Sequence, residues 1–237
     1  MFTDTGFWDT FRSLFPFLNL MFPSVNKEMQ EGLINTYKES GFFPEWASPG
    51  HRGCMVGNNS ASVVADAYLK GLRGYDIETL WEAVVHGANS VHPKVKSTGR
   101  LGYEYYNELG YVPYNVKINE SAARTLEYAY DDWCISQLAE AMGDEPNRTK
   151  YAAFAEGYKV YFDPSTRFMR GLDSEGNWRT PFNPRASTHR NDDYCEGTAW
   201  QWTWFVPHDV DGLVELMGGR DAFIGKLDSL FVADSSL

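Results

Sequence analysis

Apolar residues recur every three or four positions in several segments, the spacing that places them on one face of an α-helix. This spacing predicts helices over residues 24–39, 76–92 and 150–162, and another from Phe7 to Leu18. Residues suited to helix ends flank these segments: Ser24, Asp76 and Thr149 stand at predicted N-cap positions, and Gly41, Gly74 and Gly143 follow predicted C-termini. The chain is therefore predicted to be mainly helical.

Two other predicted helices, residues 60–72 and 121–142, are apolar on most of their circumference. A helix of that kind is buried on all sides, whereas an amphipathic helix leaves one face in solvent. Alternation of the two kinds indicates helical hairpins arranged in two layers. The predicted fold class is all-α, and an α/α toroid, whose inner helices line a central funnel, fits this alternation.

Three long segments rich in Gly, Pro and Asn connect the predicted helices: residues 42–58, 93–118 and 163–193. Connections of this length in a compact protein are either functional or disordered. Their many tryptophans and tyrosines favour ordered, functional loops. No strand-like alternation persists, and no repeat or linker divides the chain, so residues 1–237 are predicted to form a single domain.

Composition and charge narrow the function classes. The formal net charge is −11, so no basic face is available to neutralise the phosphates of a nucleic acid. No apolar run is long enough to span a membrane and no signal-peptide pattern is visible; the abrupt start of the first predicted helix suggests a chain cut from something longer. The aromatic content of 16% suits either a large helical core or a carbohydrate cleft.

Carboxylates alternate with aromatic residues in the run Glu127-Tyr-Ala-Tyr-Asp131-Asp132-Trp133. Glu127 and Asp131 are four residues apart on a predicted helix, so both carboxylates project from one face. A carboxyl group kept neutral by burial and by a nearby like charge is what a general acid requires. The structural alternative is a solvated first turn, favoured by the helix dipole. Asp132 is expected to point elsewhere, toward a neighbouring backbone group.

A second acidic and aromatic run contains Glu196-Gly-Thr198 and continues to Trp204. A carboxylate, a carbonyl group at Gly197 and a hydroxyl side chain could supply oxygen ligands to calcium. The alternative is a turn before a buried aromatic helix. The three cysteines, Cys54, Cys134 and Cys195, lack the spacing of a zinc site or a disulfide framework, and packing explains them better than nucleophilic chemistry.

Near the start of the chain, Asp9 and Arg12 have the spacing of a structural ion pair. In the functional interpretation, the Asp9 carboxylate receives two sugar hydroxyls beside the ring of Trp8. His208 follows a proline and is more typical of a structural histidine than of a catalytic one.

These runs and several others resemble glycoside hydrolase family 92, the calcium-dependent exo-acting α-mannosidases. The residues that carry the resemblance, in the order of the family, are Trp8-Asp-Thr-Phe-Arg12, Cys54-Met-Val-Gly57, Ser60 through Val64-Ala-Asp66-Ala-Tyr68, Thr125-Leu-Glu127-Tyr-Ala-Tyr-Asp-Asp-Trp133, Phe168-Met-Arg-Gly171, Trp178 with Pro181-Phe182, Glu196-Gly197 through Trp200-Gln201, and Phe205-Val-Pro-His-Asp209. Two positions depart from the family pattern: Asn59 stands where histidine is usual, and Thr198 where asparagine is usual.

The resemblance implies a fold and a set of roles. The family pairs an N-terminal β-sandwich with an (α/α)6 barrel, of which this chain would be a middle portion. Glu127 matches the general acid, Glu196 and Thr198 fall in the calcium-binding neighbourhood, and Asp9 with Trp8 would contact the terminal mannose. His208 would help to shape the outer cleft. The carboxylate general base of these inverting enzymes lies in an acidic, Gly-rich motif that is absent here.

The resemblance therefore predicts part of a Ca²⁺-dependent α-mannosidase that acts on mannose-terminated oligosaccharides, is inactive alone, and needs the missing segments of the same enzyme. It also implies a secreted, periplasmic or cell-surface location. Two alternatives stay open: a non-catalytic helical module that binds glycans through its aromatic loops, and another toroid glycosidase or lyase that uses no metal.

Overall fold

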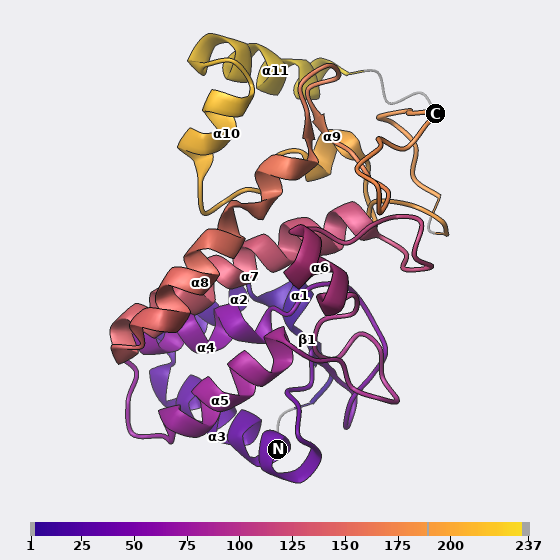
Figure 1. Ribbon diagram of the computed structural model, residues 1–237. Coiled ribbons are helices and arrows are strands. Elements are labelled where there is room, and N and C mark those ends of the chain that lie inside the picture. Colours follow the sequence, from indigo (N-terminus) through magenta and orange to yellow (C-terminus); the bar gives the residue numbers. More distant parts are fainter. Residues whose placement is uncertain (1–2, 189, 234–237) are drawn as a thin grey trace. The chain divides into compact units, whose positions relative to one another are not determined.

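The computed structural model describes residues 3–188 and 190–233 and is mainly helical (Figure 1). Its helices are α1 (Phe7–Thr10), α2 (Leu14–Met21), α3 (Pro23–Ser40), α4 (Ser60–Leu69), α5 (Ile77–Ala88), α6 (Tyr103–Leu109), α7 (Ser121–Met142), α8 (Glu145–Ala155), the 3₁₀ helix η1 (Glu156–Tyr161), α9 (Ala199–Trp202), α10 (Val210–Leu216) and α11 (Arg220–Val232). The strands have two residues each: β1 (Thr5–Gly6), β2 (Trp46–Ala47), β3 (Phe162–Asp163) and β4 (Phe168–Met169). The all-α prediction is confirmed at this level, while the (α/α)6 barrel stays a prediction.

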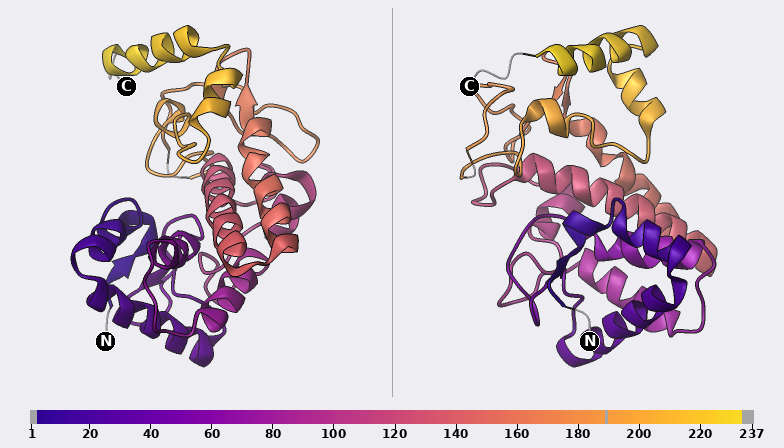
Figure 2. Two further views of the ribbon diagram at one scale, coloured as in Figure 1. Left: turned by 90° about the vertical axis from the view of Figure 1, so that its left-hand side faces the viewer. Right: turned by 180° about the vertical axis from the view of Figure 1, so that it is seen from behind.

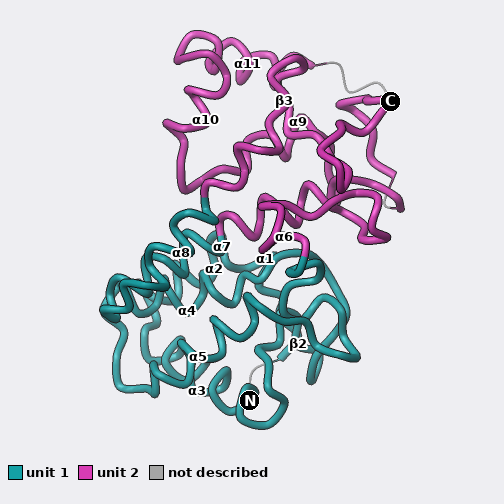
Figure 3. Tube along the Cα trace, in the orientation of Figure 1, with its two compact units in different colours: residues 1–104, 131–155 teal, residues 105–130, 156–237 magenta. Residues whose placement is uncertain are grey.

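Residue contacts divide the chain into two compact units (Figure 3). Unit 1 comprises residues 1–104 and 131–155, and unit 2 comprises residues 105–130 and 156–237. The boundary falls inside α7, whose first ten residues belong to unit 2. The single-domain assignment made from the sequence stays a prediction.

Unit 1 is built from helices α2 to α5, which pack on one another in all views (Figures 1 and 2). Its strands β1 and β2 pair antiparallel, with Gly6 opposite Trp46. Helix α4 is buried on nearly all sides, as its apolar circumference predicts, with Val63, Val64 and Ala67 at most 1% exposed. Helix α3 ends at Gly41, whose φ of 79° is the left-handed conformation that glycine adopts without strain.

Unit 2 has a core of aromatic rings around the first half of α7. The rings of Tyr106 and Tyr128 meet edge to face at 5.5 Å, and those of Tyr111 and Tyr161 at 5.6 Å. Strands β3 and β4 form an antiparallel hairpin next to α9. No helix among residues 3–188 and 190–233 combines the length and the continuous apolar character that crossing a bilayer requires.

Several predicted boundaries need correction. Helix α8 begins at Glu145, so Thr149 lies inside it, and the Asp144 carboxylate receives the backbone N–H of Asn147 instead. Ser24 likewise lies inside α3, and the chain leaves α4 at Gly71 rather than Gly74. By contrast, Asp76 caps α5 as predicted, because its side chain accepts the backbone N–H of Thr79.

Two larger differences concern whole elements. The segment from Phe7 to Leu18 forms two helices rather than one, because Pro16 cannot donate a backbone hydrogen bond and is tolerated only in the first turn, that of α2. The predicted loop over residues 93–118 contains α6, which is too short for helical periodicity to be recognised.

Candidate active site

The candidate acid, Glu127, lies in the second turn of the longest helix of the described chain. Helix α7 runs from Ser121 to Met142, as predicted, and Glu127 is its seventh residue. Its side chain is 0% exposed, as are those of Leu126 and Tyr128. A solvated first turn is therefore wrong as an account of this carboxylate.

The turn before Glu127 is fixed by a buried hydroxyl group. Thr125 donates its hydroxyl to the carbonyl of Ser121 at 2.9 Å and accepts the backbone N–H of Val112 at 3.0 Å. The Val112 carbonyl in turn accepts the phenol of Tyr161. Since all these groups are buried, the helix cannot rotate here without leaving polar groups unsatisfied.

The two aspartates that follow Glu127 on α7 make structural contacts within unit 1. Asp131 accepts the backbone N–H of Asn58 at 2.8 Å and the side-chain amide of Asn59 at 3.3 Å. Asp132 forms an ion pair with Arg100 at 2.6 Å, with both side chains 0% exposed. Asp132 therefore pairs with a residue distant in the sequence, which the sequence did not predict; the expected bond to a neighbouring backbone group stays a prediction.

The candidate metal residues follow a buried segment of unit 2. Residues 192–195 are buried, and then Glu196 is exposed and takes a φ of 45°. Thr198 precedes α9 and donates its backbone N–H to the side chain of Gln201 at 2.7 Å. The alternative offered by the sequence, a turn before a buried aromatic helix, is therefore present, and it leaves the Glu196 carboxylate in solvent.

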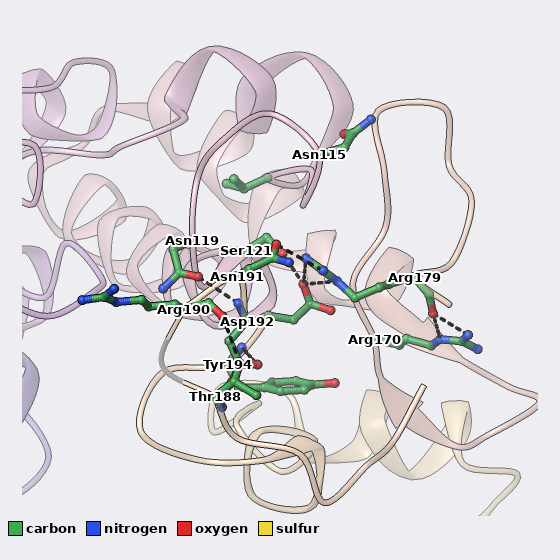
Figure 4. Close-up of polar contacts among 12 residues, drawn as sticks. Asn115, Asn119, Ser121, Arg170, Arg179, Thr188, Arg190, Asn191, Asp192 and Tyr194 are labelled. Carbon is green, nitrogen blue, oxygen red and sulfur yellow. Dashed lines mark hydrogen bonds and ion pairs between the residues drawn. The ribbon is translucent and has the colours of Figure 1, made fainter. Parts of the chain in front are cut away.

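The segment that precedes this turn lies at the start of α7, and Figure 4 shows Asn119, Ser121 and Arg179 around its residues Asn191, Asp192 and Tyr194. Asp193 in this segment accepts both Nε (3.0 Å) and Nη2 (2.9 Å) of Arg179. Burial raises the pKa of the Asp193 carboxyl, and the charge of Arg179 opposes that rise.

His208 packs among aromatic rings of unit 2. Its ring stands perpendicular to that of Tyr158 at 5.5 Å and lies 6.2 Å from that of Tyr130. Tyr130 is three residues after Glu127 on α7, so the fold brings His208 to the same helix as the candidate acid. The next residue, Asp209, caps α10 by accepting the backbone N–H of Gly212 at 2.9 Å.

The candidate sugar-contacting pair, Trp8 and Asp9, lies on the short helix α1 of unit 1. Asp9 is exposed and Trp8 is half-buried. The guanidinium of Arg12 lies 5.0 Å from the ring centre of Trp8, a cation–π arrangement that orients the ring. An exposed carboxylate beside an aromatic face is available to a ligand.

A family model for the glycosyl hydrolase family 92 catalytic domain matches residues 1–236. The chain belongs to glycosyl hydrolase family 92. Because the match covers nearly the whole chain, both compact units belong to that catalytic domain.

Solved structures of this family resemble the chain closely. The family 92 inverting mannosidase BT2199 from Bacteroides thetaiotaomicron is 47% identical with a TM-score of 0.93, over 97% of this chain and 30% of that protein. The family 92 α-mannosidase BT3965 from the same organism is 37% identical with a TM-score of 0.87, over 96% of this chain and 30% of that protein. An uncharacterized secreted glycosidase from Arthroderma benhamiae is 30% identical over 84% of this chain. The family 92 chain spans about 30% of the length of these relatives.

The described residues meet few of the requirements of a calcium site. Glu196 offers one exposed carboxylate, a hard oxygen ligand of the kind calcium prefers. Calcium usually takes six to eight oxygen ligands. Within the described ranges, no three His, Cys, Asp or Glu side chains are grouped to hold a metal ion.

The structure also reveals a buried carboxylate in this family 92 chain that the sequence did not single out. Glu45, in the loop before α4, accepts the side-chain amide of Asn58 at 2.7 Å and both the hydroxyl (2.5 Å) and the backbone N–H (3.1 Å) of Ser60. Burial raises its pKa from 4.5 to about 7, against these hydrogen bonds and the charge of Arg100. No local pattern marks it, because its partners are assembled by tertiary packing.

The cysteines of the family 92 chain behave as packing residues, as the sequence favoured. All three are free thiols, and Cys134 and Cys195 are buried. Burial and the neighbouring Glu120 carboxylate raise the pKa of the Cys195 thiol far above its ordinary value. A thiol held in its neutral form is a poor nucleophile.

Proposed function

We propose that this chain is part of an inverting, calcium-dependent exo-α-mannosidase in which Glu127 is the general acid. The observation that carries the proposal is the fully buried Glu127 carboxylate on a helix whose preceding turn is held by the hydrogen bonds of Thr125, within a chain matched throughout by the family 92 catalytic domain. The similarity to an inverting mannosidase from Bacteroides supports both the substrate class and the stereochemistry.

The proposed role of Glu127 is to protonate the leaving oxygen of the glycosidic bond. Burial disfavours the charged form of a carboxyl group, so an acid in this environment can keep its proton until the bond breaks. In an inverting enzyme the base activates water across the ring, with the two carboxyl groups roughly 6.5–9.5 Å apart. We propose that this base is not among the family motifs found in the 237 residues. Without it, the chain alone should have little turnover.

The proposed sugar contacts are Trp8, Asp9 and His208. The exposed Asp9 carboxylate would accept two hydroxyl groups of the terminal mannose, and the Trp8 face would cover the apolar side of the pyranose. His208, held by the Tyr158 and Tyr130 rings, would border the outer cleft. The complex of a family 92 α-mannosidase with mannoimidazole supports a mannose-type ligand.

Glu196 and Thr198 are the proposed contribution of this chain to a Ca²⁺ site. A bound calcium ion would supply positive charge to vicinal sugar hydroxyls. The exposed Glu196 carboxylate suits such a ligand, and Thr198 adds a hydroxyl oxygen two residues later. The similarity to a secreted glycosidase supports export of the protein that carries these residues.

The direct test replaces Glu127 by Gln in the longest natural chain that contains these residues and measures hydrolysis of methyl α-mannoside and of dinitrophenyl α-mannoside. Loss of a general acid should lower kcat by about 10²–10⁴-fold for a poor leaving group such as methanol. The loss should be much smaller for dinitrophenolate, which departs without a proton. Glu140→Gln is the matched control, because Glu140 is an exposed carboxylate on the same helix.

Three outcomes would refute parts of the proposal. Equal rates of wild type and Glu127→Gln on the substrate with the poor leaving group would show that Glu127 is not the general acid. Activity that survives chelation with EGTA would favour a metal-independent toroid glycosidase. Calorimetric binding of mannobiose without cleavage in the complete protein would favour the non-catalytic module.

A further inference from the structure

Backbone carbonyls of the loop that carries Glu196 cap the first turn of α7. The backbone N–H of Glu120 donates to the Asp192 carbonyl at 2.7 Å, and that of Ala123 donates to the Asp193 carbonyl at 3.0 Å. Asn119 accepts the Asp192 N–H at 2.9 Å. The first amides of a helix have no partner within the helix, so this loop satisfies two groups that α7 leaves open.

Three side chains hold the capping loop in place. The Asp193 carboxylate accepts the Ser121 hydroxyl at 3.1 Å and two N–H groups of Arg179. The Arg179 guanidinium also lies over the Tyr114 ring at 4.1 Å. Figure 4 shows Arg179 reaching the start of α7 from the opposite side of this loop.

The backbone around Arg179 is held as firmly as its side chain. The Arg179 N–H donates to the Gly171 carbonyl at 2.8 Å, and its carbonyl accepts two N–H groups of Arg170, which pairs with Asp163 at 2.9 Å. A Cβ atom at Gly171 would lie 2.3 Å from Oδ2 of Asp193. The close packing of Asp193 therefore depends on glycine at 171.

We infer that Asp193, pinned by Arg179, is a positioning residue that holds the acid Glu127 and the metal-side residue Glu196 at a fixed separation. Glu196 follows Asp193 by three residues, and Glu127 follows the capped Glu120 by seven, roughly 10 Å along a rigid helix. The positions of the Glu127 and Glu196 carboxylates therefore both depend on where Asp193 is held. This inference rests on the proposed function, because it assigns roles to both carboxylates.

Stability alone is a weak explanation for this arrangement. The Asp193 side chain is 5% exposed and that of Arg179 is 23% exposed, and an ion pair withdrawn from solvent often contributes no more to folding than apolar residues of similar volume, because desolvation offsets the attraction between the charges. What it provides is a defined geometry, since the Arg179 fork accepts few orientations of its partner. Variants that disturb this geometry should therefore change the properties of Glu127 and Glu196 more than they change the stability of the fold.

The test uses three variants of the 237-residue chain and one control. Gly171→Ala pushes Asp193 aside without changing any charge, Arg179→Lys keeps the charge but loses the fork, and Asp193→Asn keeps the shape but loses the charge. The control is Asp173→Asn, which removes a carboxylate that accepts N–H groups of its own turn, among them those of Glu175 and Asn177.

Two readouts report on the two groups separately. The titration of the Glu127 carboxyl carbon is followed by NMR with ¹³C-labelled glutamate, assigned with Glu127→Gln. The affinity of the Glu196 turn for a lanthanide is measured with Tb³⁺ alone, whose luminescence is sensitised by nearby tryptophans. The melting temperature of each variant shows whether the fold is retained.

Positioning predicts that Gly171→Ala, Arg179→Lys and Asp193→Asn each shift the Glu127 titration and weaken Tb³⁺ binding by about 10–100-fold, the usual effect of a group that orients a ligand. Both effects should be absent in Asp173→Asn. A lower melting temperature with an unchanged Glu127 titration and unchanged Tb³⁺ affinity would overturn the inference and leave a purely structural cap. If the wild-type chain binds no Tb³⁺, the proposed metal role of Glu196 fails, and the Glu127 titration alone then decides whether Asp193 positions the acid.

Discussion

Burial and hydrogen bonding have opposite effects on the pKa of the Glu45 carboxyl group, and their balance can be measured. Its carboxylate accepts three hydrogen bonds from Asn58 and Ser60, which favour the ionised form, while complete burial favours the neutral form. Burial prevails, and the pKa rises from 4.5 to about 7. The folded protein therefore keeps a proton that the unfolded chain releases above pH 4.5.

The sign and size of the effect follow from this difference. The contribution of Glu45 to stability is fully present below pH 4.5 and is lost as the pH rises through about 7. Each pH unit between the folded and unfolded pKa corresponds to about 1.4 kcal/mol. The loss across this window is therefore about 3 kcal/mol.

Glu45→Gln isolates this contribution, because glutamine has nearly the same shape and does not titrate. Urea unfolding followed by circular dichroism gives the free energy of unfolding of both proteins at several pH values from 4.5 to about 7.5. Relative to the variant, wild type should lose about 3 kcal/mol as the pH rises. The control Glu140→Gln, at an exposed site, should show no such slope.

A difference between wild type and Glu45→Gln that does not change with pH would refute the reasoning. It would mean that the hydrogen bonds from Asn58 and Ser60 fully compensate for burial. A slope of opposite sign would mean that they outweigh it, together with the charge of Arg100.

Three further predictions concern other parts of the chain. Asp132→Asn leaves the buried Arg100 without its carboxylate partner and should lower the free energy of urea unfolding by about 3–5 kcal/mol; a loss near zero would contradict the ion pair. Gly41→Ala, at a φ of 79°, should cost roughly 1–2 kcal/mol, whereas Gly32→Ala, inside α3 with open space for a Cβ, should stabilise by about 0.5–1 kcal/mol. Burial lowers the pKa of Lys226 to about 8, so wild type should gain stability relative to Lys226→Met between pH 8 and about 10.5 in urea titrations. The Lys226 ammonium lies over the rings of Phe168 and Trp200, and a difference that does not change with pH would show that these rings compensate for burial.

Helical periodicity located the long helices because it is a local property. Helix α7 has the predicted bounds, and α3 differs from the prediction by one residue at each end. The predicted helices are wrong where a single residue prevents a backbone hydrogen bond, as Pro16 does. Helix α6 was missed because it is too short to show a helical repeat of apolar residues.

The sequence by itself determined which residues belong to family 92 and which carboxylates carry its motifs, since those runs are contiguous. It could not determine what each carboxylate meets. Asp132 finds Arg100 and Glu45 finds Asn58 across long stretches of chain, and the cap of α7 comes from residues more than sixty positions away. Whether a carboxylate is exposed, paired or kept neutral depends on the groups that surround it in space, and only the tertiary structure places those groups.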